Sequence, residues 1–78
     1  MASFEYLVCS AQLQHLTFLN GRWQGEIPPN AAGALNSCPH LFDFLQEAGE
    51  SGWELVAVTS TKDDSLTTLY LKREKTNG

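Results

Sequence analysis

The feature that most constrains this chain is a change of hydrophobic period at Gly52. Before Gly52, apolar residues recur at the i, i+3, i+4 and i+7 spacing that forms one stripe along a helix. Ser37 is suited to the N-cap of this helix and Pro39 to its first turn, while Gly52 is suited to a left-handed C-cap. The predicted stripe consists of Leu41, Phe44, Leu45 and Ala48.

After Gly52, apolar and polar residues alternate with the period of two that indicates a strand, from Trp53 to Thr61. The same alternation predicts strands from Phe4 to Ala11 and from Leu66 to Arg73. A helix with one apolar stripe must bury it against another element. We therefore expect an α+β fold, in which an antiparallel sheet of about four to five strands carries a single helix on one face, in the order β-β-β-α-β-β.

A hairpin is predicted around Asn20-Gly21, because a type I′ turn needs positive φ at both of its central residues. In this register Leu19 faces Arg22, and Phe18 faces Trp23 in a non-hydrogen-bonded pair. Aromatic cross-strand pairs of this kind stabilise a sheet, so the turn residues and the strand residues favour the same pairing.

Residues 25–37 form the predicted connector between hairpin and helix, and Pro28-Pro29 fixes an extended conformation within it. We expect this connector to be flexible and the C-terminal tail to be loose from about residue 74. Seventy-eight residues make one domain, 1–78, with a thin core.

Charge and hydropathy limit the partners. Nine acidic residues outnumber five basic ones and give a net charge of −4, whereas a nucleic-acid-binding face must neutralise phosphates. We expect no nucleic-acid partner. No apolar run approaches the roughly 20 residues that span a bilayer, and the first residues lack the basic and apolar regions of a signal peptide. We therefore expect no membrane partner and a cytoplasmic location.

One helix can cover only one face of the predicted sheet. In the simple alternation from Trp53 onward, Trp53 and Leu55 face the helix, while the opposite face carries Val56, Val58 and Tyr70. Either the Phe4/Tyr6/Val8 set or the Leu7/Cys9 set joins them. Exposed apolar patches usually mark interaction surfaces, and small domains often associate to complete a core. We predict a homodimer or higher homo-oligomer, with a possible protein partner, and an interaction surface that contains Trp23, Phe18, Val56, Val58 and Tyr70.

The sequence gives little support for a reactive thiol or a metal site. At the start of a helix, Cys38 would have a lowered pKa, and His40 could assist it. A small buried thiol is the ordinary alternative. The spacing of Cys9, His15, Cys38 and His40 does not match the close pairs of structural zinc sites. Glu54 is expected to pair with Lys72 or Arg73 across the sheet. We predict no catalytic residue, cofactor or metal.

The strand at 4–8, the Gly-Trp-Glu-Leu-Val segment at 52–56 and the Tyr-Leu-Lys-Arg segment at 70–73 resemble a family of short bacterial proteins known only as a domain of unknown function. The Asn-Gly hairpin and the connector resemble an elaboration of a cyanobacterial subgroup. The resemblance covers about two-thirds of the chain and implies a small β-α-β-β unit without an assigned activity.

Taken together, these patterns predict a non-enzymatic, self-associating module for protein interaction or regulation. The alternative is a small-molecule or redox-sensing domain that uses the connector and Cys38.

Overall fold

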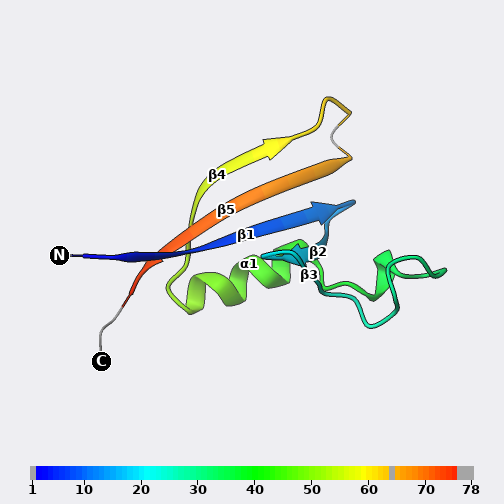
Figure 1. The fold of residues 1–78 in the computed structure, drawn as a ribbon, viewed down its shortest axis with the longest axis horizontal. Coiled ribbons are helices and arrows are strands. Elements are labelled where there is room, and N and C mark those ends of the chain that lie inside the picture. Colours follow the sequence, from blue (N-terminus) through cyan, green and yellow to red (C-terminus); the bar gives the residue numbers. More distant parts are fainter. Residues whose placement is uncertain (1, 64, 76–78) are drawn as a thin grey trace.

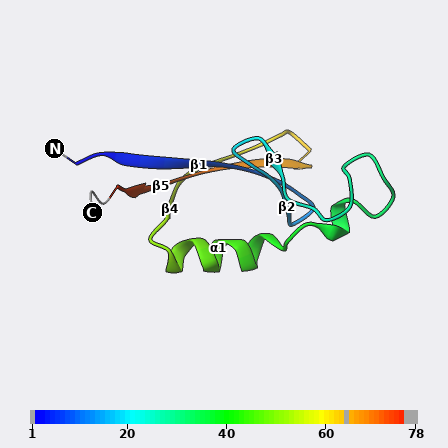
Figure 2. The ribbon, with the colours of Figure 1, turned by 60° about the horizontal axis from the view of Figure 1, so that its bottom comes forward.

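The computed structural model describes residues 2–63 and 65–75. Five antiparallel strands form one sheet in the order β3-β2-β1-β5-β4, and one α-helix lies on one side of it (Figures 1 and 2). No second α-helix of the described chain covers the opposite side. The predicted α+β class and element order are confirmed. The elements are β1 (Phe4–Gln12), β2 (His15–Leu19), β3 (Arg22–Trp23), a short 3-10 helix η1 (Leu35–Ser37), α1 (Leu41–Glu50), β4 (Glu54–Ser60) and β5 (Leu66–Glu74).

The two central strands, β1 and β5, decide which residues face α1. Both alternate, and their register pairs Cys9 with Leu69 and Leu7 with Leu71. Because paired residues share a face, these four side chains lie on the helix side, where Ala48 completes the buried cluster. The predicted helix stripe is confirmed, since Leu41, Phe44 and Leu45 pack against the same cluster.

The β1–β2 connection is a two-residue turn that carries no sequence signal for a turn. Leu13 and Gln14 have φ values of 48° and 67°, in the left-handed region that side-chain-bearing residues rarely adopt. Two backbone hydrogen bonds hold this end of the sheet to the start of α1. The Leu41 N–H donates to the Gln14 carbonyl at 2.8 Å, and the Leu16 N–H donates to the Pro39 carbonyl at 2.8 Å.

The helix begins later than predicted. Ser37 ends η1 and does not cap α1, Cys38 is extended with ψ 150°, and His40 is the N-cap residue. The cause is Pro39, because a proline ring excludes the residue before it from the helical region. The predicted placement of Cys38 in the first helical turn is therefore wrong.

The C-terminal end of α1 agrees with the prediction. Gly52 has φ 91°, its N–H donates to the Gly49 carbonyl at 3.0 Å, and the Trp53 N–H donates to the Ala48 carbonyl at 3.0 Å. This pair of bonds is the Schellman motif. It turns the chain directly from α1 into β4 and brings Trp53 against the core.

A β-bulge changes the faces of β4. Leu55 pairs with Leu71 and Ala57 pairs with Tyr70, so Val56 is an extra residue without a partner of its own. Downstream of it, Val58 pairs with Leu69 and therefore lies on the helix side of the sheet. The predicted placement of Val58 beside Tyr70 is wrong, because the simple alternation did not include the inserted residue.

Two segments that were predicted to be flexible or loose make specific hydrogen bonds. In the 25–37 connector, the Ile27 N–H donates to Ser37 Oγ at 3.1 Å, and Ser37 Oγ donates to the Ala34 carbonyl at 2.6 Å. Of the tail predicted to be loose from about 74, Glu74 ends β5 and the Lys75 N–H donates to the Ser3 carbonyl at 2.8 Å. Residues 76–78 lie outside the described part.

Candidate interaction surface

The side of the sheet opposite α1, here called the outer face, carries a continuous group of exposed apolar side chains. The register of the strands places them in neighbouring rows, each of which consists of residues that pair across adjacent strands. Val8, Tyr70 and Ala57 form a central row, and Tyr6 lies one row away on β1. Tyr6 is 61% exposed. The large apolar members of the outer face are Phe4, Tyr6, Val8, Phe18, Trp23 and Tyr70.

The sequence left open which side of β1 faces outward, and the structure resolves this. Cys9 is completely buried, whereas Val8 is 40% exposed. The Phe4/Tyr6/Val8 set is therefore the outer one. The signal was ambiguous because both sides of this strand are apolar, and only the position of α1 distinguishes them.

The hairpin contributes an aromatic pair at one end of the outer face. Phe18 pairs with Trp23 and Leu19 with Arg22, as predicted. The two aromatic rings meet edge to face, with centroids 5.4 Å apart. Trp23 Nε1–H donates to the Ile27 carbonyl at 2.9 Å, so the polar end of the indole is bonded within the chain. The apolar ring of Trp23 is the part left to contact a partner.

The charges on the outer face are largely paired internally. Lys72 lies between Tyr6 and Glu54 in one row. Its Nζ is 3.7 Å from Glu54 Oε1 and 4.7 Å from the centroid of the Phe4 ring. The predicted pairing of Glu54 with a basic residue of β5 is thus confirmed for Lys72.

The remaining predicted surface residues lie on β4, at the edge of the sheet. All seven residues of this strand are exposed, and the exposed fractions of Val56 and Val58 are 49% and 50%. Val56 is the bulge residue beside Ala57, while Val58 is on the helix side. The structure thus brings Phe18, Trp23 and Tyr70 together on the outer face, with Val56 at its border, and separates Val58 from them.

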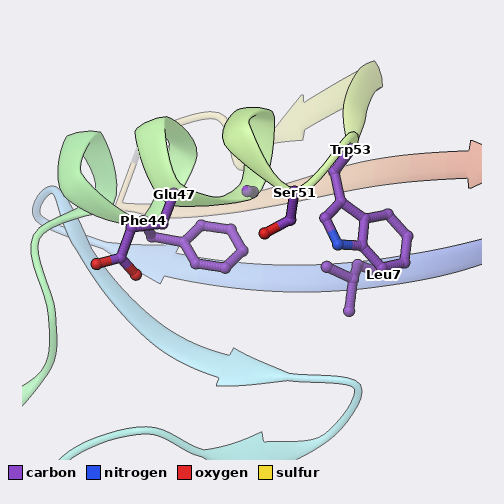
Figure 3. Close-up of a pocket in the computed structure, with 6 residues that line it drawn as sticks. Leu7, Phe44, Glu47, Ser51 and Trp53 are labelled. Carbon is purple, nitrogen blue, oxygen red and sulfur yellow. The ribbon is translucent and has the colours of Figure 1, made fainter.

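On the helix side, a groove of about 200 Å³ lies between the C-terminal half of α1 and β1 (Figure 3). Phe44, Leu7 and the Trp53 indole line it, with Glu47 and Ser51 at its polar border. Small-molecule sites usually enclose roughly 300–1,000 Å³. The groove therefore supports ligand binding less than the outer face supports protein contact.

The thiols are not placed for chemistry. Cys38 is 4% exposed, and its Sγ is 3.6 Å from the Ala34 carbonyl oxygen. Burial raises the pKa of the Cys38 thiol, and it raises the pKa of Cys9 to about 11. The lowered pKa expected for Cys38 is wrong, since this residue precedes the helix and is buried.

The two histidines, by contrast, lie together. The rings of His15 and His40 have centroids 4.8 Å apart, and His15 Nδ1 is 3.0 Å from the Cys38 carbonyl oxygen. Within the described ranges, no three side chains of the His, Cys, Asp and Glu types are grouped closely enough to hold a metal ion. The described chain also contains no helix of the length and apolar character needed to cross a membrane.

Comparison of the chain with protein-family models, with curated proteins and with solved structures found no match. The resemblance to the Gly-Trp-Glu-Leu-Val family therefore stays a prediction.

Proposed function

We propose that this chain is a non-enzymatic, self-associating protein-interaction module whose contact surface is the outer face of the sheet. The observation that carries this proposal is the concentration of exposed aromatic and aliphatic side chains on one side of β1, β2 and β5, with the partly buried Trp23 of β3 beside them. Large apolar patches on a small protein mark a place where another surface binds.

The composition of the core supports the same conclusion. Among the described residues, the buried apolar side chains include only three leucines, and the others are alanine and cysteine. Alanine and cysteine bury little apolar area, and each square ångström removed from water contributes only about 25 cal/mol. A partner that binds the folded state adds stability by mass action. Covering the outer face would thus supplement a core of small side chains.

The outer face is also large enough for a specific contact. β1 and β5 each have nine residues, which span about 30 Å at a rise of roughly 3.4 Å per residue. Five strands spaced about 4.8 Å apart measure about 20 Å across. Because β2, β3 and β4 are shorter, the five strands together contain 32 residues and cover about 500 Å², which is below the roughly 800 Å² that each partner contributes to a standard interface and suits a small, weaker specific contact.

The non-enzymatic part of the proposal rests on the position of the reactive groups. Cys9 and Cys38 are buried with raised pKa values, and the imidazoles of His15 and His40 contact each other. Cys9 lies on the helix side of the sheet, and Cys38 lies directly before α1. No observation favours the redox-sensing alternative, because a sensing thiol needs a lowered pKa and access to solvent.

Light scattering coupled to size exclusion tests the proposal directly. We expect a mass of at least two chains that declines toward one chain on dilution. A single-chain mass up to a concentration on the order of 100 μM, where even weak specific complexes form, would contradict self-association.

A further inference from the structure

We propose that the occupant of the outer face is a second copy of this chain, packed sheet against sheet around a two-fold axis that crosses the strands at the Val8–Tyr70 row. This inference rests on the proposed self-association and specifies its geometry. Each strand would then lie over the same strand of the partner. Val8 would face Val8, and Tyr70 would face Tyr70.

A sheet is the natural partner for the outer face. Two sheets that pack face to face interdigitate the side chains of their inner surfaces across about 10 Å. This arrangement requires apolar side chains on both inner surfaces. In a two-fold dimer the same patch serves both subunits, so the outer face of a second copy meets the requirement without any further partner.

The polar rows on either side of the Val8–Tyr70 row select the direction of the axis. On one side lies the charged row, with Lys72 and Glu54. On the other side, at the same spacing of two residues, lies a row of hydroxyl groups from Ser10, Thr68 and Thr59.

An axis across the strands exchanges these two rows. The charged row of each copy then faces the hydroxyl row of the other, where the hydroxyl groups can donate to Glu54 and accept from Lys72. An axis along the strands instead keeps charged row against charged row. That arrangement gives the Lys72–Glu54 pair no hydroxyl group of the partner as a further hydrogen-bond partner, and a buried ion pair without such partners is unfavourable, so the axis across the strands is favoured.

The other route to a dimer, pairing of two β4 edges, fits the structure less well. The bulge at Val56 interrupts the regular hydrogen-bonding edge, and bulges are one of the devices that protect edge strands from pairing. Edge pairing would also leave Tyr6, Val8 and Phe18 exposed. Face packing about the axis across the strands covers Tyr6 and Val8, which lie on β1 over the same strand of the partner.

Charge substitutions distinguish the two modes. Tyr70→Glu and Tyr6→Glu each place a carboxylate on the outer face of both copies, and we expect the dimer Kd to rise at least about 100-fold. Phe42→Glu is the matched control, because Phe42 is 70% exposed on α1, away from the outer face. Val58→Lys tests the edge, since an edge lysine blocks strand addition. Both controls should leave the mass of the dimer unchanged.

The outcomes separate the two proposals. If Val58→Lys gives a monomer while the two tyrosine variants stay dimeric, self-association stands and the face-packed geometry is overturned. A monomeric parent chain overturns both. Circular dichroism confirms the fold of each variant. Should Tyr70→Glu unfold, Tyr6→Glu decides, because Tyr6 is 61% exposed in the single chain whereas Tyr70 is 37% exposed.

Cross-linking tests the axis itself. In the proposed dimer the two Cα atoms at position 70 lie about 10 Å apart, and those at position 72 about 17 Å apart, from the sheet spacing and the strand rise. A short bismaleimide should therefore join Tyr70→Cys chains much faster than Lys72→Cys chains. The native cysteines are buried and provide little background. Equal or reversed rates would overturn the axis across the strands.

Discussion

The guanidinium of Arg73 lies over the indole of Trp53, with Cζ 4.3 Å from the ring centroid. Its Nη1 donates to the Ser51 carbonyl at 2.9 Å, and its Nη2 donates to Glu5 Oε1 at 3.2 Å. One side chain on β5 thus binds the end of α1, the residue that leads into β4, and β1.

Replacing Arg73 should weaken the contacts that join the end of α1, Trp53 and β1 and so lower the stability of the fold. Arg73→Ala removes a cation–π contact, a charged hydrogen bond to a helix-end carbonyl and an ion pair that is partly exposed. We expect a loss of about 1–2 kcal/mol in the free energy of unfolding, measured by urea denaturation. Arg73→Lys should recover only part of it, because lysine lacks the planar fork. A Lys75→Ala control should be near neutral, and an equal effect of the two alanine variants would contradict the assignment.

The Leu13-Gln14 turn offers a stabilising substitution. Both residues adopt positive φ, which costs roughly 1–2 kcal/mol per side-chain-bearing residue. Replacing them by Asn-Gly, the favoured type I′ pair, should raise the free energy of unfolding by about 1–2 kcal/mol. The reciprocal change at Asn20-Gly21, to Leu-Gln, should lower it. Thermal or urea unfolding of both variants provides the comparison, and a destabilised Asn-Gly variant would show that the Leu13 or Gln14 side chain has a role of its own.

Acid stability should depend on Asp63. Its carboxylate accepts hydrogen bonds from Thr61 Oγ1 at 2.7 Å, Ser65 Oγ at 2.7 Å and the Ser65 N–H at 3.1 Å. These bonds lower the pKa of Asp63 from 3.8 to about 2. The folded pKa is below the unfolded one, so this stability is present above about pH 4 and is lost as the pH falls toward about 2.

Asp63→Asn should therefore flatten the dependence of unfolding free energy on pH within that window. Ser65→Ala, which removes the hydroxyl donor and keeps the N–H, should have an intermediate slope. The measurement is urea denaturation at a series of pH values. An unchanged slope in Asp63→Asn would contradict the hydrogen-bonded carboxylate.

Both thiols should be slow to react in the folded protein. Burial keeps Cys9 and Cys38 protonated at neutral pH, and the thiolate is the reactive form. We expect labelling by a disulfide reagent to be much slower than for a free thiol, and to become fast once denaturant unfolds the chain. Rapid labelling of Cys38 in the native state would restore the redox-sensing alternative.

The sequence predicted the turns and helix ends correctly where they contain residues that readily adopt positive φ. Asn20-Gly21 fixed the hairpin register, and Gly52 marked the end of α1, because few other residues adopt positive φ at low cost. The start of α1 needed a steric effect that acts one residue before Pro39. The Leu13-Gln14 turn could not be predicted, since neither residue favours positive φ and the hydrogen bond to the Gln14 carbonyl comes from Leu41, which is distant in the sequence.

The candidate surface was predictable only in part. Phe18, Trp23 and Tyr70 followed from alternation and the hairpin register. Phe4, Tyr6 and Val8 remained one of two options, because β1 is apolar on both sides. Val58 was misplaced because a one-residue bulge leaves no distinctive composition in a strand of valine, alanine and threonine.

The bulge also divides β4 into two parts whose orientation depends on chain length rather than on residue type. Deleting Val56 would restore uninterrupted alternation from Glu54 onward. Val58 would still pair with Leu69 on the helix side, whereas a regular strand that kept Val56 as a paired residue would turn Val58 to the outer face. The extra residue, rather than the type of any side chain, therefore decides what the two sides of the protein present along this strand.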